Sequence, residues 1–331
     1  MMQAGKSGKE PCKNTRKKKS EDKVPMVDMS NLWNMQGMMF LMVLTGMIFS
    51  KIGVITKEGR SCLTKLTINL FIPCNMVAAF LNADHSMLFQ MAEIMLISFV
   101  IQIAQYILSK ILFRKMDPRE RAVMRYSTMV SNAGFLGNPM IQGMYGESGL
   151  VLASVFLVPV RLFYWTVGLA CYVPVKNKKD VVRQALTHPC IISLFIGLFL
   201  MLVPLPLPAF LTKTINSFST AMTPATMLLI GAILGDVDLK TIVNKTTLYM
   251  SFLRLVVIPA AVFAVMLFLP VEPLMAAVTV VLIAMPVATT TAILAERYDG
   301  DSELATKVIV LSTILSLITI PVWSMIVEHC F

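Results

Sequence analysis

The chain has 331 residues, of which 56% are hydrophobic and only 15% are charged, and its net charge is +10. An average globular domain is roughly a quarter charged, so this chain lacks the polar side chains that would cover a soluble protein. The composition, with a mean hydropathy of +0.73, excludes disordered, collagenous and disulfide-scaffold classes and predicts a polytopic membrane protein. The positive charge does not indicate nucleic-acid binding, because the basic residues cluster in short connections between apolar segments.

The first part of the chain, residues 1–29, is basic and has no apolar run, which predicts a disordered tail. It lacks the apolar core and cleavage site of a signal peptide. About ten apolar segments follow, each near the ~20 residues that a helix needs to cross a bilayer. We predict membrane-spanning helices near residues 30–50, 63–82, 88–113, 121–143, 148–174, 189–204, 211–234, 241–269, 272–295 and 304–327.

Lysine and arginine alternate along the predicted connections: the odd-numbered connections are basic, and the even-numbered ones contain almost none. The positive-inside rule places the odd connections in the cytoplasm and both termini outside, in a multi-pass protein of the plasma membrane. The basic tail contradicts this orientation. Either the tail overrides the rule locally, or translation starts later, for example at Met26, Met29 or Met35. The later start is favoured, because the other connections agree with one another.

Glycine and proline recur with nearly matching spacings in the two halves of the chain. The residues are Gly46, Pro73 and Pro139 in the first half, and Gly197, Pro224 and Pro286 in the second. Each half holds an odd number of predicted helices, so the second half enters the membrane from the opposite side. We therefore predict an inverted repeat, as in many secondary transporters, with units at residues 30–174 and 189–331 joined by a cytoplasmic linker at 175–188.

The fourth predicted helix contains the sequence Ser131-Asn132-Ala133-Gly134-Phe135-Leu136-Gly137-Asn138-Pro139. Pro139 removes a backbone donor and the nearby glycines lower helix propensity, so we predict a break here, near the middle of the membrane. The freed backbone groups, with the side chains of Asn132 and Asn138, then become available to a ligand. A proline kink with glycine-mediated packing explains the same residues without a ligand.

The ninth predicted helix is interrupted at the corresponding place by Pro286, which is followed by hydroxyl residues that include Thr289 and Thr290. Interrupted helices at matching positions of two inverted halves indicate a substrate site, and the positive ends of half-helices favour an anion. The threonine hydroxyls can instead bond to carbonyl groups of their own helix. The pair of interruptions favours the binding-site interpretation.

Three charged residues lie at least five residues inside the ends of predicted helices: Glu93, Arg161 and Arg254. Charges at this depth are costly and indicate function. Two interpretations are open for Arg254: it attracts an anionic substrate, or it forms a fixed structural or gating pair with Glu93, which is favoured because both charges are then satisfied. Glu93 is the candidate for coupling or gating. We assign no role to Arg161, which can extend to the interface or to helix-end carbonyls.

These sequences resemble the auxin efflux carrier family, which includes plant PIN-type exporters and bacterial malonate or malate permease-like proteins. The similar segments are Ser131–Pro139 with Tyr145–Glu147, Leu70–Pro73, His188-Pro189 with Gly197, Arg254-Leu255 through Pro259, and Met285–Thr289. The resemblance covers about residues 30–327. It implies ten helices in an inverted five-plus-five repeat, a crossing of helices four and nine around the substrate, and alternating access. Asn138 departs from the apolar residue that the family usually has before the proline.

The sequence thus predicts a secondary transporter of a small organic anion, of the mono- or dicarboxylate class. A channel or a ligand-sensing membrane protein without net transport is the alternative. An enzyme is not expected, because HExxH and GxSxG motifs are absent from the sequence. The sequence also has no Walker A motif and no cysteine–histidine spacing typical of a metal site, so we expect no cofactor. It leaves open a homodimer and coupling to protons or sodium.

Overall fold

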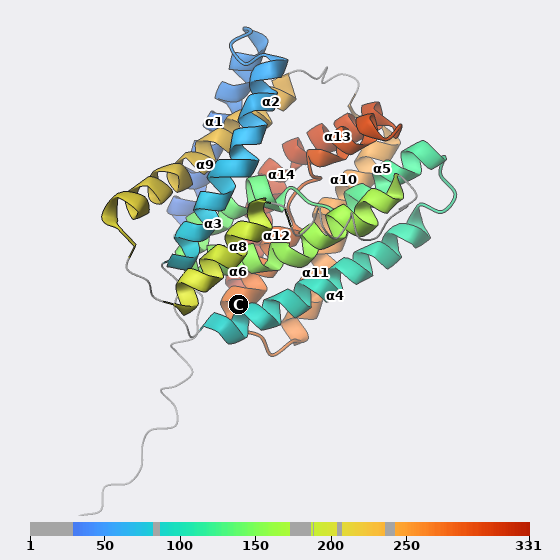
Figure 1. The fold of residues 1–331 in the computed structure, drawn as a ribbon. Coiled ribbons are helices and arrows are strands. Elements are labelled where there is room, and N and C mark those ends of the chain that lie inside the picture. The colour runs from blue at the N-terminus through green and yellow to red at the C-terminus, as the bar shows by residue number, and fades with distance from the viewer. Residues whose placement is uncertain (1–28, 82–86, 173–186, 188, 204–206, 236–241) are drawn as a thin grey trace, which may run out of the picture.

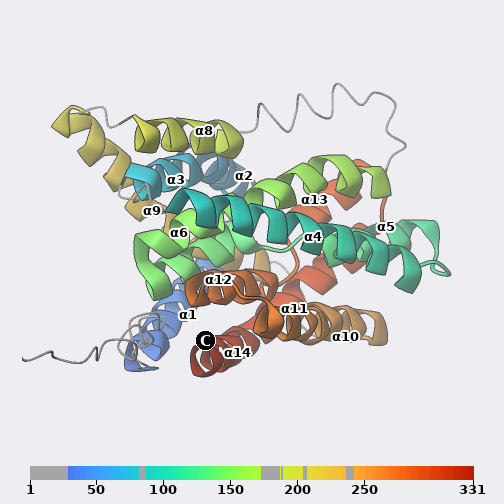
Figure 2. The same cartoon turned by 90° about the horizontal axis from the view of Figure 1, so that it is seen from below.

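The computed structural model describes residues 29–81, 87–172, 187, 189–203, 207–235 and 242–331. The elements within these ranges are helices, which pack side by side in one bundle (Figures 1 and 2). The α-helices are α1 (Met29–Lys51), α2 (Lys57–Leu66), α3 (Ile72–Leu81), α4 (Leu88–Leu112), α5 (Pro118–Met129), α6 (Asn138–Phe163), α8 (Pro189–Leu202), α9 (Ala209–Gly235), α10 (Lys245–Phe252), α11 (Ile258–Phe268), α12 (Pro273–Ile283), α13 (Thr290–Arg297) and α14 (Ser302–Cys330). The predicted basic tail and linker lie outside the described residues, apart from Met29 and Thr187.

Among the described residues, six helical segments are long and apolar enough to cross a membrane. They are Lys57–Leu81, Leu88–Leu112, Ala133–Cys171, Ala209–Gly235, Lys245–Phe268 and Ser302–Cys330. Shorter apolar helices lie at Gly37–Lys51, Ile191–Leu202 and Pro273–Ile283. The chain is therefore an all-helical, multi-pass membrane protein, as its composition predicted.

Prolines widen the helices that contain them. The π-helical turns η1 (Thr67–Phe71), η3 (Ala133–Gly137) and η6 (Leu253–Val257) each end two residues before a proline. A helical proline lacks the N–H group and its ring presses on the carbonyl four residues earlier, which a wider turn relieves. For Pro259 that carbonyl belongs to Leu255, and the indole Nε1–H of Trp323 donates to it at 2.8 Å. A side chain from α14 thus replaces the lost backbone donor.

Glycines allow close packing between helices from the two halves of the chain. A β-carbon on Gly46 of α1 would collide with the backbone of Leu228 in α9. A β-carbon on Gly197 of α8 would lie 2.8 Å from the ring of Phe80 in α3. Small residues at such contacts let helices approach closely in a membrane. Helix α1 thus packs on α9, and α8 packs on α3.

Helix α6 changes path at Gly146, whose φ of 64° and ψ of −155° are not helical. Glycine adopts this conformation readily because it has no β-carbon. The change falls where the sequence predicts the connection between its fourth and fifth helices, around Glu147. The five-residue turn η4 (Tyr164–Gly168) and the 3₁₀ turn η5 (Leu169–Cys171) extend this helical segment to its end.

Candidate functional site

Two interruptions of the helices meet in the core of the bundle. Residues 130–132 separate α5 from η3, and residues 284–289 separate α12 from α13. An antiparallel bridge joins Ser131 in the first interruption to Val287 in the second. We call this meeting of the two unwound segments the crossing.

The crossing is held by backbone hydrogen bonds between the two segments. The N–H of Asn132 donates to the carbonyl of Pro286 at 2.8 Å, and the N–H of Ala288 donates to the carbonyl of Val130 at 3.3 Å. Backbone groups without helical partners therefore bond to each other. Inside a membrane such groups need a partner within the protein, because no water is available to them.

The first interruption lies upstream of the break that the sequence predicts near Pro139. Pro139 instead lies inside the helical segment that begins at Ala133, at the junction of η3 and α6, where its missing N–H does not end the helix. The preceding turn η3 absorbs the bulk of the proline ring. The interruption precedes η3, and Asn132 is the residue just before that turn. The backbone carbonyl of Asn132 accepts a hydrogen bond from the N–H of Leu136 at 2.9 Å.

Arg254 ties the two interruptions together. Its Nε–H donates to the carbonyl of Met285 at 3.2 Å and its Nη1 group to the carbonyl of Thr128 at 3.0 Å, while the residue is only 1% exposed. Thr128 is in the last turn of α5, and Met285 follows the end of α12. The guanidinium thus lies at two helix C-termini, where the backbone dipoles present negative charge.

The ion pair between Arg254 and Glu93, one of the two interpretations of the sequence, does not form. Both residues lie in the described part of the chain, and there the contacts of Arg254 are with backbone carbonyls. Glu93 is half-buried on α4. The charge of Arg254 is compensated by helix ends and needs no acid.

The predicted asparagines are buried without side-chain partners. Asn132 is 2% exposed and its Nδ2 has no hydrogen-bond partner among the described residues. Asn138 is fully buried, and neither its Oδ1 nor its Nδ2 has a partner there. Such groups are uncommon in native proteins, so each calls for a ligand, a water or another conformation.

The predicted threonines lie where the second interruption leads into α13. Thr289 is half-buried at the residue before the helix, and Thr290 is its first residue. The Thr290 hydroxyl lies 3.3 Å from the hydroxyl of Tyr126. The ring of Tyr126 packs against those of Tyr164 and Tyr172, with both pairs of ring centroids 5.7 Å apart.

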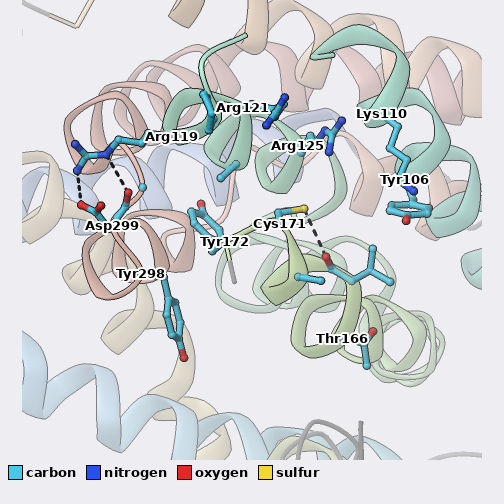
Figure 3. A pocket seen from close by; sticks show the side chains of 15 residues that line it. Tyr106, Lys110, Arg119, Arg121, Arg125, Thr166, Cys171, Tyr172, Tyr298 and Asp299 are labelled. Atoms are coloured by element: carbon cyan, nitrogen blue, oxygen red, sulfur yellow. Dashed lines mark hydrogen bonds and ion pairs between the residues drawn. The ribbon is translucent and has the colours of Figure 1, made fainter. Parts of the chain in front are cut away.

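A basic pocket of about 820 Å³ lies beyond these tyrosines (Figure 3). Its cationic lining residues are Lys110 from α4 and Arg119, Arg121 and Arg125 from α5. Arg119 pairs with Asp299, and both side chains are more than half exposed. Tyr172 lines the pocket, but the predicted site residues do not. The tyrosine cluster therefore lies between this pocket and the crossing.

A polar chain that the sequence did not reveal links α3, α6 and α9. Asn75 Nδ2 donates to Gln142 Oε1 at 3.0 Å and lies 3.1 Å from Ser219 Oγ. Gln142 Nε2 donates in turn to Glu147 Oε1 at 2.9 Å. Isolated polar residues in apolar helices give no periodic signal, and the position of Asn75 two residues after Pro73 is the one hint in the sequence.

Apolar helices that enclose a crossing of two unwound segments are a feature found in membrane transporters. Residues 35–324 match the family model described as "Membrane transport protein", and the chain belongs to this family. The resemblance to the auxin efflux carrier family is thereby confirmed.

The relatives of this chain are also transporters. It is 28% identical over 292 residues to an uncharacterized transporter of Methanothermobacter thermautotrophicus, a match that covers 86% of this chain and 95% of the relative. It is 27% identical over 299 residues to an uncharacterized transporter of Methanocaldococcus jannaschii, and this match covers 86% of this chain and 96% of the relative. It is 20% identical over 295 residues to the uncharacterized transporter YfdV of Escherichia coli, and this match covers 86% of this chain and 93% of the relative.

Replacement of Arg254 tests its role at the crossing. Arg254→Met leaves the carbonyls of Thr128 and Met285 buried without their donors, and we expect a loss of about 1–3 kcal/mol of stability for each. Thermal unfolding of the purified protein measures this loss. Arg119→Gln, which removes an exposed arginine, is the control and costs at most ~1 kcal/mol. A melting temperature of Arg254→Met equal to that of the wild type would contradict the role.

Asn138→Leu separates a structural role of this residue from a functional one. The change removes two buried amide atoms that have no partners in this conformation, so we expect an unchanged or higher melting temperature. Uptake of carboxylates into proteoliposomes should fall roughly tenfold if the amide serves the substrate. Asn69→Leu, on an exposed surface, is the control. Reduced stability with normal uptake would assign Asn138 to packing.

Proposed function

We propose that this protein is a secondary transporter that carries a small organic anion, of the mono- or dicarboxylate class, by alternating access around the crossing. The observation that supports it is the bridge between Ser131 and Val287, which brings the N-terminal ends of η3 and α13 to the same place. Helix N-termini are positive and favour anions. The opposing C-terminal ends are already neutralised by Arg254.

In this proposal the substrate is bound by the polar groups beside the crossing. Asn132, Asn138, Thr289 and Thr290 provide hydrogen bonds to it during the transport cycle. Asn132 and Asn138 are the stronger candidates, because their buried amides lack partners in the described residues. Arg254 holds the two segments together and does not contact the substrate.

The reciprocal packing of α1 on α9 and of α8 on α3 supports an inverted repeat of ten helices. Alternating access then moves the segments from α4 to η5 and from α10 to α14 against α1 to α3, α8 and α9. Each moving group contributes one interruption, so the crossing travels as a unit. The helices that stay fixed include those joined by the glycine contacts at Gly46 and Gly197.

Proline substitutions test the proposal. Pro139→Ala and Pro286→Ala restore a backbone donor near the crossing and favour a closed helix, so initial uptake of radiolabelled malonate, malate or succinate should fall at least tenfold while expression survives. Pro273→Ala is the control, because a proline in the first turn of α12 removes no helical bond. Normal uptake by both variants would show that the crossing is not the transport site.

We also propose that the basic connections face the cytoplasm and that both termini lie outside, in the plasma membrane. Lys115 and Glu272 are exposed on connections of opposite predicted sides. In a cysteine-free background, a cysteine at position 272 should react with an impermeant thiol reagent on intact cells. A cysteine at position 115 should react only after permeabilisation. The reverse pattern would invert the orientation.

A further inference from the structure

Arg161 is a charge inside an apolar helical segment, and it has no charged partner among the described residues. It lies near the end of α6, within the apolar segment Ala133–Cys171. Among the described residues its hydrogen-bond partner is the sulfur of Met76, 3.7 Å from Nη1. A thioether is a weak acceptor, whereas a guanidinium carries five N–H donors. Most of these donors therefore have no acceptor in the part of the chain that the structure describes, although charges within membrane-spanning helices are normally paired.

The Arg161 side chain reaches the crossing. Its Nη2 atom lies 4.0 Å from the position that a β-carbon on Gly134 would occupy. Gly134 is the second residue of η3, so the guanidinium stands beside the N-terminal end of the helical segment that runs from η3 to the change of path at Gly146. The first N–H groups of a helix have no partners within it, and this end carries positive charge. A cation here is repelled unless an anion accompanies it.

The two arginines near the crossing have opposite surroundings. Arg254 lies at helix C-termini, donates to two carbonyls and is 1% exposed. Arg161 lies at a helix N-terminus and is only half-buried. Arg254 is thus electrostatically satisfied, and the positive charge around Arg161 is not.

The position beside Gly134 and Arg161 is open. A β-carbon on Gly134 would have no atom of another element within 4 Å other than that Nη2. A β-carbon on Gly137 would instead lie 2.8 Å from Leu282 and 3.2 Å from Met285. Gly134 is therefore open toward Arg161, whereas Gly137 is packed against the end of α12. The unpartnered Nδ2 of Asn132 belongs to the same helix end.

The Arg161 side chain also contacts a helix that the proposed movement leaves fixed. Met76, which receives the contact from Arg161, belongs to α3. Its sulfur lies 3.6 Å from the hydroxyl oxygen of Ser193 in α8. Arg161 thus stands where the moving segment of η3 and α6 meets α3 and α8. A substrate must occupy this boundary if alternating access is to expose it to each side in turn.

We propose that Arg161 binds the carboxylate of the transported anion, together with the first N–H groups of η3 and the amide of Asn132. This inference rests on the proposed function and names the group that selects for anions. The planar guanidinium matches a carboxylate through two parallel hydrogen bonds. The ligand class is a small carboxylate with one carboxyl group at Arg161.

Thermal stabilisation of the purified protein by acetate, benzoate, malonate, succinate and malate tests the proposal, with uncharged malonamide as the ligand control. A ligand that binds the folded protein raises its melting temperature. We expect Arg161→Gln to weaken binding of the stabilising carboxylate roughly ten- to hundredfold. Arg161→Lys should retain part of the affinity, since it keeps the charge but loses the paired donors. Arg119→Gln should bind like the wild type.

Gly134→Ala provides a second test that leaves the charge in place. Alanine favours the helix over glycine, so the ligand-free protein should be at least as stable as the wild type. The added methyl group occupies the open space beside Arg161, so carboxylate affinity should fall at least tenfold. Gly37→Ala is the matched control, because its β-carbon would meet no atom within 4 Å.

Wild-type carboxylate affinity in both Arg161→Gln and Gly134→Ala would overturn the assignment of Arg161, while uptake that is sensitive to Pro286→Ala would leave the transporter proposal intact. Stabilisation of the wild type by none of the carboxylates would overturn both the anion class and the site. Equal stabilisation by malonamide and malonate would likewise exclude recognition of charge.

Discussion

The structure depends on one constraint: backbone groups that leave a helix inside a membrane must find partners within the protein. The two interruptions meet this constraint by bonding to each other, through Asn132 with Pro286 and Ala288 with Val130. The N–H of Val287 also donates to Ser312 Oγ, at 3.2 Å. Because each interruption needs the other, neither can be lost without leaving unpaired groups in its partner. A local break in two helices thus becomes a single unit that joins distant parts of the chain.

Helix ends of opposite partial charge have different surroundings at the crossing. The C-termini of α5 and α12 point to one arginine, Arg254, whose hydrogen bonds to two carbonyls neutralise them. The N-termini of η3 and α13 start from the crossing, and Arg161 lies against the first of them. The negative ends are therefore compensated within the protein, and the positive ends are not. This imbalance supports an anionic substrate more directly than the net charge of the chain does.

Patterns along the sequence revealed the helical class and both interrupted helices, because apolar length and proline act locally. The exact break was harder to predict, since a π-helical turn before Pro139 accommodates the proline ring without ending the helix. The partner of Arg254 was also hidden. An arginine in an apolar segment suggests an acidic side chain as its partner. Backbone carbonyls at helix ends can serve instead, and they cannot be identified from the sequence because every residue has one. Gly134 and Gly137 look equivalent in sequence, yet one is open and the other is packed.

The basic pocket shows why the number of positive charges is a poor guide to the site. Arg119 is paired with Asp299 in exposed positions, and Lys110 lies 4.4 Å from the ring centroid of Tyr106. Two unit charges 4 Å apart interact by about 1 kcal/mol in bulk water and by about 4 kcal/mol at the lower effective dielectric of a protein. Salt screens the exposed charges further. The proposed site at Arg161 therefore rests on its place beside a helix N-terminus and not on a count of charges, and the exposed Arg119 of the pocket is the weaker candidate for a carboxylate.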